Sequence, residues 1–207
     1  MKTTAFYPLF LDLTGKLCVV IGGGAVASRK VRALLAAGAS VKLIGPEVTK
    51  GIARLAAEGK IALTLREYRK GDLEGAALVF AAAGKEEVAR QVKAEAQRRG
   101  VPMNAADAPD LCDFLVPSTI RRGPITIAIS TSGVLPMLSK KLRQEIARSL
   151  TADHAACARR VGAFRRYLLK HIESAGERRR VMARVARADL HDLARMSLAE
   201  MKRRFLP

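Results

Sequence analysis

The sequence predicts an α/β fold in which a parallel sheet carries helices on both faces, followed by a β/α segment and a helical region. Apolar runs alternate with amphipathic stretches along the first half of the chain, and short turns connect them. This alternation is typical of parallel sheets. Two apolar runs, 17–21 and 77–83, are continuous, as expected for strands that are buried on both faces.

The elements of the sheet follow one another in a simple order. We expect strands at 17–21, 40–45, 61–68, 77–83 and 101–106, and helices at 25–37, 47–58 and 86–99. Gly38, Gly59 and Gly100 directly follow the three helices, at the position where a left-handed backbone commonly ends a helix.

The pattern changes after Asp107. Two strand-like runs, 113–123 and 124–133, follow each other without a helix between them. A helix is expected at 135–150, because its apolar residues recur at helical spacing. Residues 151–207 read as helical and hold 14 Lys or Arg against 6 Asp or Glu. We therefore expect three parts: 1–112, 113–150 and 151–207.

Composition excludes some functions and leaves others open. The 207 residues are 49% hydrophobic and 27% charged, which is typical of a folded globular protein. Only 4% are aromatic and Trp is absent, which disfavours a module that stacks nucleic-acid bases. The net charge of +18 is compatible with nucleic acid, an anionic membrane surface or a polyanionic small substrate, or with a solvated basic surface.

The chain shows no targeting or metal-binding pattern. No apolar run reaches the roughly 18 residues of a membrane span, and the N-terminus lacks the features of a signal peptide, so we expect a cytoplasmic protein. The three cysteines are widely spaced, and Cys18 is expected to be a small buried hydrophobe. His154, His171 and His191 lack the spacing of a helical metal pair, so no metal site is predicted.

A glycine motif follows the first strand. The run Gly22-Gly23-Gly24-Ala25-Val26-Ala27 matches G-x-G-x-x-A, opens a helix and heads a βαβ unit. Gly22 permits the tight turn, Gly24 lets the backbone approach a diphosphate, and Ala27 lets the helix pack close to the sheet. The helix N-terminus then offers N–H groups to the phosphates. The motif predicts a Rossmann-type dinucleotide site that includes Gly22, Gly23, Gly24, Ala25 and Val26.

The end of the second strand bears on cofactor choice. An acidic residue usually binds the ribose 2′-hydroxyl there. In this chain the stretch contains Pro46 and Glu47 and has no Arg that could hold a 2′-phosphate. We therefore assign Pro46 and Glu47 to the cofactor site and expect NAD rather than NADP.

At this point the sequence resembles the precorrin-2 dehydrogenases, which form the N-terminal module of siroheme synthases and also occur as free-standing proteins. Residues 22–30 are similar to the family run G-G-G-x-V-A-x-R-K. The other matching stretches are Tyr7-Pro8-Leu9-Phe10, Asn104-Ala105-Ala106-Asp107 with Phe114 and Pro117-Ser118, and Ser132-Gly133 with Pro136 and Leu142-Arg143. Together these stretches cover residues 7 to about 150 in the family's order.

The resemblance implies an NAD-dependent oxidation of precorrin-2 to sirohydrochlorin. In some members the same site then inserts ferrous iron, which is a substrate. The resemblance also implies a homodimer in which the middle segment interlocks between protomers. We expect no methyltransferase domain, because 207 residues leave no room for one. Neither a membrane nor a specific nucleic acid is expected as a partner.

The resemblance also carries site residues. It assigns Asp107 as the catalytic carboxylate and implies substrate contacts at Asn104, Ser118, Ser132 and Gly133. From the residues alone, Asp107 has two interpretations. It follows the fifth strand, where parallel sheets bind ligands, and a carboxylate there could accept a proton. Without the resemblance, the favoured interpretation is that it caps the turn before Pro109 through its own backbone.

The chain departs from the family at one position. Many members have a Ser directly before the proline of S-x-x-G-x-S-P, where this chain has Leu135. The change removes a hydroxyl that could touch substrate or cap the helix.

Two other functions remain open. An NAD-sensing regulatory module would share the glycine loop, but not the F-x-x-P-S segment or the basic tail. A nucleic-acid-binding protein would use the basic tail and bind with a steep salt dependence. Arg178, Arg179 and Arg180 form either a solvated helix face or a surface that attracts a polycarboxylate.

Overall fold

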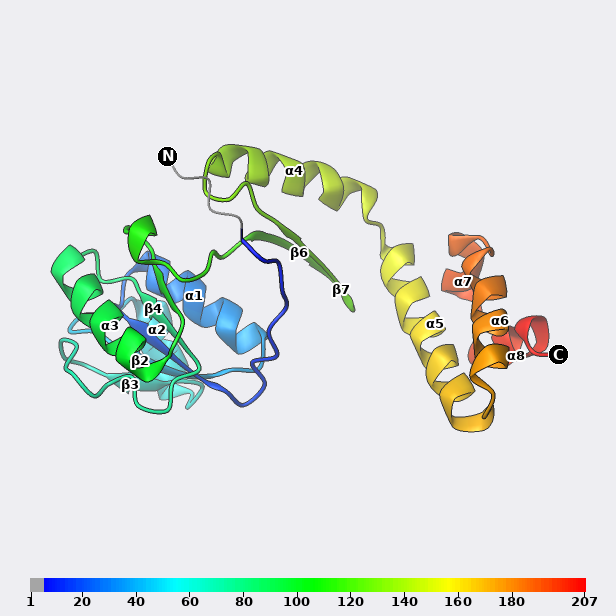
Figure 1. The fold of residues 1–207 in the computed structure, drawn as a ribbon, viewed down its shortest axis with the longest axis horizontal. Helices are drawn as coiled ribbons and strands as arrows, with labels where there is room; N and C mark the ends of the chain where they lie inside the picture. The colour runs from blue at the N-terminus through cyan, green and yellow to red at the C-terminus, as the bar shows by residue number, and fades with distance from the viewer. Residues whose placement is uncertain (1–5) are drawn as a thin grey trace. The chain divides into compact units, whose positions relative to one another are not determined.

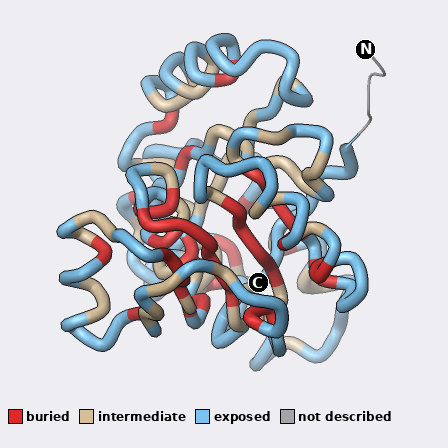
Figure 2. The backbone as a smooth tube through the Cα atoms, turned by 90° about the vertical axis from the view of Figure 1, so that its left-hand side faces the viewer, coloured by how far each residue is buried: buried red, intermediate tan, exposed pale blue. Residues whose placement is uncertain are grey.

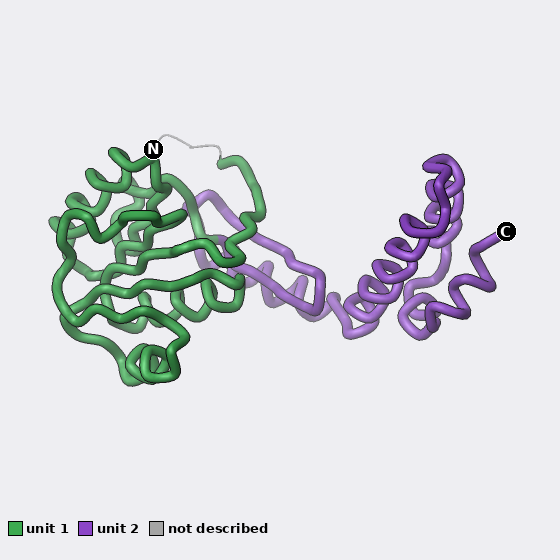
Figure 3. The backbone as a smooth tube through the Cα atoms, turned by 90° about the horizontal axis from the view of Figure 1, so that it is seen from below, with its two compact units in different colours: residues 1–116 green, residues 117–207 purple. Residues whose placement is uncertain are grey.

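The computed structural model describes residues 6–207, and the chain divides into two compact units between Val116 and Pro117 (Figure 3). The first unit contains the sheet and its helices (Figure 1). Its elements are β1 (Leu17–Ile21), α1 (Ala25–Ala36), β2 (Ser40–Ile44), α2 (Lys50–Ala57), β3 (Ala62–Thr64), β4 (Leu78–Ala81), α3 (Glu86–Arg99), β5 (Met103–Ala105) and the 3-10 turn η1 (Pro109–Leu111).

The five strands form one parallel sheet in the order β3-β2-β1-β4-β5. The central strand β1 pairs with β2 on one side and β4 on the other, so Val20 lies opposite Leu43 and Phe80. This confirms the predicted Rossmann-type α/β fold. The chain first adds strands on one side of β1 and then crosses to the other, so the strand order reverses between β1 and β4. Folds of this kind bind ligands at that point, beyond the carboxyl ends of the strands.

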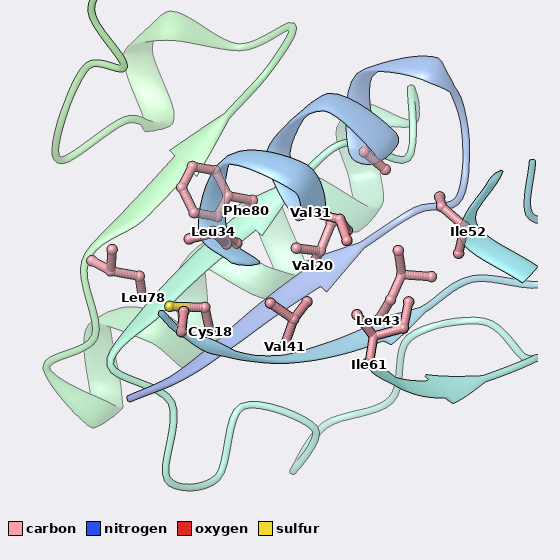
Figure 4. Close-up of a cluster of buried hydrophobic side chains, with 12 residues drawn as sticks. Cys18, Val20, Val31, Leu34, Val41, Leu43, Ile52, Ile61, Leu78 and Phe80 are labelled. Carbon is pink, nitrogen blue, oxygen red and sulfur yellow. The ribbon is translucent and has the colours of Figure 1, made fainter. Parts of the chain in front are cut away.

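Alternate side chains of the strands enter two separate cores. Cys18 and Val20 point into one core with Val31 of α1 and Ile52 of α2, which Figure 4 shows gathered beside the sheet. The next residues along β1, Val19 and Ile21, point into a second core that includes residues of α3. The buried segments run along the central strands (Figure 2). The expectation that Cys18 is a buried hydrophobe is confirmed, since none of its surface is exposed.

Two boundaries in the first unit differ from the prediction by three or more residues. The second helix begins at Lys50 rather than at residue 47, because the Thr49 hydroxyl accepts a hydrogen bond from the Ile52 N–H (3.4 Å) and caps the helix there. The third strand ends at Thr64 rather than at residue 68. Beyond it the chain turns, and the Arg66 guanidinium forms a two-pronged pair with the Asp72 carboxylate, both contacts at 2.7 Å.

The second unit begins with a two-stranded antiparallel ribbon. Its elements are β6 (Ser118–Arg122), β7 (Ile125–Ile129), α4 (Pro136–Ser149), α5 (Ala152–His171), α6 (Ala175–Ala186), α7 (Leu190–Arg195) and α8 (Leu198–Phe205). Gly123 makes the turn between the strands with φ +58°. The first of these strands starts at residue 118 and not at 113, since residues 112–114 are engaged along β5, as described below.

The last four helices have a core of their own. Phe164 and Leu168 of α5 pack with Val181 of α6, Leu193 of α7 and Phe205 of α8. The predicted helical nature of this region is therefore confirmed. Among residues 6–207, no helix is both long and apolar enough to cross a lipid bilayer.

Candidate functional site

A cavity of about 530 Å³ opens where the strand order reverses. It lies at the carboxyl ends of β1, β2 and β4, which is where a doubly wound sheet binds ligands. All seven residues that the sequence assigns to the cofactor line this cavity: Gly22, Gly23, Gly24, Ala25, Val26, Pro46 and Glu47. Asp107 lines it as well.

The three glycines are needed for different reasons. Gly22 has φ +110°, and a Cβ there would lie 2.3 Å from the Ala82 carbonyl oxygen. A Cβ on Gly23 would lie 1.9 Å from the Glu47 carbonyl oxygen. Gly22 and Gly23 thus let the loop pass close to the neighbouring chain segments. A Cβ on Gly24 would meet nothing within 4 Å. Because Gly24 lines the cavity, the missing side chain leaves room for a ligand against the backbone.

The N-terminus of α1 is open toward the same cavity. Gly24 is its N-cap and supplies no side-chain acceptor, and the first turn holds no acidic residue. The first intrahelical bond is donated by the Ser28 N–H to the Gly24 carbonyl (3.0 Å), so the N–H groups before it have no acceptor within the helix. N–H groups in this arrangement, at the positive end of the helix dipole, bind phosphate. These residues therefore fit the diphosphate of a dinucleotide.

Three polar residues of the cavity were missed by the sequence analysis. Glu67 and Tyr68 follow β3, and Lys85 follows β4. The available signal was their position, since all strands of a parallel sheet end at the same edge. Recognisable motifs mark that edge only after the first, second and fifth strands.

Tyr68 is held rigidly. Its hydroxyl donates a hydrogen bond to the Glu95 carboxylate, which is almost fully buried and also accepts from the Gly71 N–H (2.9 Å) and Arg99 Nε (2.7 Å). Burial raises the pKa of Tyr68, and the neighbouring carboxylate of Glu95 raises it further. Burial alone would raise the pKa of Glu95, but these hydrogen bonds outweigh burial and lower it. The phenol is thus a fixed wall of the cavity.

A second cavity of about 250 Å³ lies at the carboxyl ends of β4 and β5. Its walls are mostly alanine and glycine. Ala83, Gly84, Lys85 and Asp107 line both cavities. Asp107 therefore stands where the two spaces meet.

The Asp107 side chain is available to a ligand. The residue is exposed, and no hydrogen bond joins its carboxylate to any residue between 6 and 207. The turn-capping bond considered from the sequence is thus not seen in the described part of the chain.

The four residues expected to contact substrate have different surroundings. Asn104 is buried, and its amide donates to the Phe114 carbonyl (3.0 Å) and the Cys112 sulfur (3.5 Å). In the second unit, Ser118 opens β6 opposite Ile129. Ser132 (φ +53°) and Gly133 (φ +81°) form a turn with left-handed backbone. Such strain in a serine is common at functional sites, and the substrate contacts of all four residues stay predictions.

The turn at residues 131–134 leads into α4. Leu135 is the N-cap of this helix and makes no side-chain capping bond. Instead, the Thr131 hydroxyl accepts from the Leu135 N–H (3.2 Å) and hydrogen-bonds with the Ser139 hydroxyl (3.1 Å). Thr131 thus satisfies the N–H of the N-cap residue, whereas the N–H groups of the first turn of α4 receive no side-chain capping bond.

The three histidines have local partners. His154 hydrogen-bonds with Thr151, His171 stacks on Tyr167 and His191 contacts Asp153 at 2.7 Å. In the described part of the chain, no three His, Cys, Asp or Glu residues gather into a group that could hold a metal ion.

Comparison with known proteins places this geometry in context. Residues 9–118 match the family model described as "Putative NAD(P)-binding", and residues 122–149 match the model "Sirohaem biosynthesis protein central". The siroheme synthase of Methylobacillus flagellatus is 41% identical over 174 residues, which are 84% of this chain and 37% of that protein. The siroheme synthase of Methylococcus capsulatus is 35% identical over 201 residues, or 97% of this chain and 42% of that protein. This chain therefore spans about two fifths of the length of these relatives.

A solved structure shares the fold. SirC, a precorrin-2 dehydrogenase, superposes with a TM-score of 0.81 at 21% sequence identity, over 97% of this chain and 98% of that one. The superposition includes the parallel sheet and the helical region after it.

Proposed function

This chain belongs to the NAD(P)-binding family that its residues 9–118 match, and from that membership we propose that it oxidises precorrin-2 to sirohydrochlorin with NAD. The observation that carries the proposal is the position of Asp107, which borders both the cavity with the glycine loop and the smaller cavity beside it. The match of residues 122–149 to the central sirohaem biosynthesis model and the likeness to siroheme synthases support this substrate.

The residues of the cavities suggest how the cofactor is held. The glycine loop and the N-terminus of α1 would bind the diphosphate of NAD. Glu47 would face the ribose of one of the two nucleotides of NAD. The other nucleotide would extend toward the smaller cavity, where alanine and glycine leave room for a flat ring. A carboxylate at Glu47 disfavours the additional phosphate of NADP, because like charges repel.

The reaction removes one hydride and one proton from the macrocycle. When bound, NAD supplies the acceptor for the hydride and its two electrons. The Asp107 carboxylate accepts the proton and passes it to water, because the residue is exposed. The rigid wall made by Tyr68 keeps the cavity in shape while the reactants are aligned.

The test is an assay of the purified chain with precorrin-2 and NAD. We expect equal amounts of NADH and sirohydrochlorin, followed by their absorbance. Folded protein that binds NAD but forms no NADH from precorrin-2 would contradict the proposal and favour an NAD-sensing module. A separate arm with sirohydrochlorin and ferrous iron measures the chelation that the family resemblance implies for some members.

We also propose a homodimer through residues 113–150. The ribbon of β6 and β7 has one buried hydrophobic residue, Ile120, and a two-stranded ribbon is marginally stable by itself. Val134, Leu135, Met137 and Leu138 expose apolar side chains at the start of α4. Exposed apolar clusters of this kind mark protein interfaces.

A further inference from the structure

The last strand of the sheet has a free edge that the following loop covers. This edge strand is β5. Within it, the backbone N–H and C=O groups of Met103 and Ala105 point away from β4. Asp113 pairs with Met103 twice: its N–H donates to the Met103 carbonyl (2.8 Å), and its carboxylate accepts from the Met103 N–H (2.9 Å). Residues 104–113, here called the Asp107 loop, are thus closed at their base by one residue pair, and Asp107 lies between the two ends.

The base of the loop is also tied to α3. The Asp113 carboxylate accepts a hydrogen bond from the Lys93 ammonium. Burial alone would raise the pKa of Asp113, but the bonds from Lys93 and the Met103 N–H outweigh burial and lower it. Asp113 therefore stays ionised and keeps both bonds at neutral pH.

Cys112 fills the inside of the loop. Its sulfur accepts from the Ala105 N–H (3.2 Å) and from the Asn104 amide (3.5 Å), and its thiol can donate to the carbonyl of Ala105 (3.2 Å) or Ala108 (3.6 Å). The thiol thus joins the strand before Asp107 to the residue directly after it. The thiol adds to two other bonds of the loop, from the Leu111 N–H to the Ala108 carbonyl (3.1 Å) and from the Asn104 amide to the Phe114 carbonyl (3.0 Å).

We propose that Cys112 is a positioning residue for Asp107. Its thiol holds the Asp107 loop in the conformation that places the carboxylate where the two cavities meet. This inference rests on the proposed function, because it assigns Cys112 an effect on the reaction through Asp107. Cys112 itself lines neither cavity.

The residue type suits this task. A thiol donates and accepts hydrogen bonds, so one side chain satisfies an N–H and a carbonyl together. Alanine at this position would leave the Ala105 N–H without its acceptor and would open a gap inside the loop. Serine keeps both hydrogen-bonding functions and most of the volume, so Cys112→Ser should retain part of the kcat that Cys112→Ala loses.

The experiment compares Cys112→Ala and Cys112→Ser with Cys157→Ala, a matched change at a half-buried cysteine in the second unit. We expect Cys112→Ala to lower kcat about 10- to 100-fold, since small misplacements of reacting groups cost that much. NAD affinity should stay within about twofold, because the glycine loop is untouched. Cys112→Ser should recover much of kcat, and Cys157→Ala should match the parent protein.

Two further measurements separate positioning from general destabilisation. In an Asp107→Asn background, Cys112→Ala should cause no further loss of residual turnover, because its effect passes through Asp107. Hydrogen exchange of amides 104–113 should accelerate in Cys112→Ala and not in Cys157→Ala. Equal kcat in Cys112→Ala and the parent, or additive losses in the double variant, would overturn the proposal.

The same data distinguish failure of this inference from failure of the proposed function. If the parent protein does not oxidise precorrin-2, the proposed function fails and the catalytic effect of Cys112 fails with it. Hydrogen exchange still reports whether the thiol holds the loop. If the parent is active and loop exchange is unchanged in Cys112→Ala, only the positioning role is overturned.

Discussion

Lys85 Nζ lies 3.1 Å from Glu67 Oε1, and both side chains line the larger cavity. Of the described residues around this cavity, Lys85 alone is a cation, and Glu67 neutralises it. Replacing Glu67 with Gln should free the ammonium for the cofactor's diphosphate. We expect Glu67→Gln to tighten NAD binding by at most about fivefold, since exposed ion pairs contribute up to ~1 kcal/mol.

Calorimetric titration with NAD measures this change, and Glu74→Gln is the control. Glu74 is exposed and outside the cavity, so its variant alters net charge equally without touching Lys85. Weaker binding in Glu67→Gln would show instead that the carboxylate contacts the cofactor directly.

Gly24→Val should separate cofactor binding from folding. A side chain at Gly24 meets no described atom within 4 Å of its Cβ, so the fold should tolerate it while the cavity fills. We expect NAD affinity to fall at least about tenfold, as for the loss of a diphosphate contact. The free energy of unfolding should fall by only about 1 kcal/mol, through the poorer N-cap.

Gly22→Val is the contrasting variant. Its Cβ would lie 2.3 Å from the Ala82 carbonyl oxygen at a backbone φ of +110°, so this protein should be poorly folded. Thermal unfolding and NAD titration of both variants provide the comparison. Unchanged NAD affinity in Gly24→Val would contradict the phosphate-loop assignment.

Asp107→Asn should lower turnover strongly and leave NAD binding intact. Removing a general base lowers rates by about 10²–10⁴-fold, and the carboxylate forms no hydrogen bond with residues 6–207 that the fold would lose. Steady-state kinetics with precorrin-2 measure the effect. Asp110→Asn is a control from the same loop, since Asp110 is exposed and lines neither cavity. Near-parental turnover in Asp107→Asn would mean that another group takes the proton.

The Arg66–Asp72 ion pair should make the free energy of unfolding depend on pH. The hydrogen bonds from Arg66 lower the pKa of Asp72 and outweigh the opposing effect of burial, with further help from the Arg69 N–H and Lys42. A lowered pKa contributes stability at pH values above the unfolded pKa of about 4, and this contribution is lost as the pH falls through the folded-state value. Asp72→Asn should therefore cost about 1.5–3 kcal/mol at pH 7.

Urea unfolding at pH 7 and at pH 3 measures this difference. The gap between the parent and Asp72→Asn should narrow at pH 3, because this pH lies below the unfolded-state pKa of about 4 and the unfolded chain then binds the proton more readily than the folded state does. A gap that stays the same at both values would show that the carboxylate's charge does not stabilise the fold.

Met137→Glu should weaken the proposed homodimer. Met137 is 79% exposed on α4, so a charge there should not disturb the single chain, whereas it would be buried unpaired in an interface. Sedimentation at several protein concentrations should show a shift toward monomer. Gln97→Glu adds the same charge at an exposed position of α3, outside residues 113–150, and should leave assembly unchanged. If the parent protein sediments as a monomer, the proposed homodimer is refuted.

Much of the fold could be read from the sequence because its signals are local. The alternation of Cys18, Val19, Val20 and Ile21 between two cores follows from the period of a strand, and the glycine after β1 is required by one backbone angle. The boundaries of α2 and β3 were wrong because a cap at Thr49 and a pair between Arg66 and Asp72 override apolar patterning.

The candidate site was predictable only where a motif marks it. The glycine loop and Asp107 were found through known patterns, and the structure brings them to the rim of one cavity. Glu67, Tyr68 and Lys85 belong to no pattern, because any residue at the end of a strand can reach the shared edge. No sequence pattern marks Cys112, because its bonds to Ala105 and Ala108 depend on how the chain returns along β5.

The sequence by itself determined the order of strands and helices and the loop that receives a diphosphate, since hydrophobic period and backbone angles act over a few neighbouring residues. Tertiary structure alone decided that Gly24 and Asp107, far apart along the chain, line one cavity. That meeting depends on strand order, because β1 and β4 become neighbours only when the chain crosses over the sheet. Local periodicity contains no information about such a crossing.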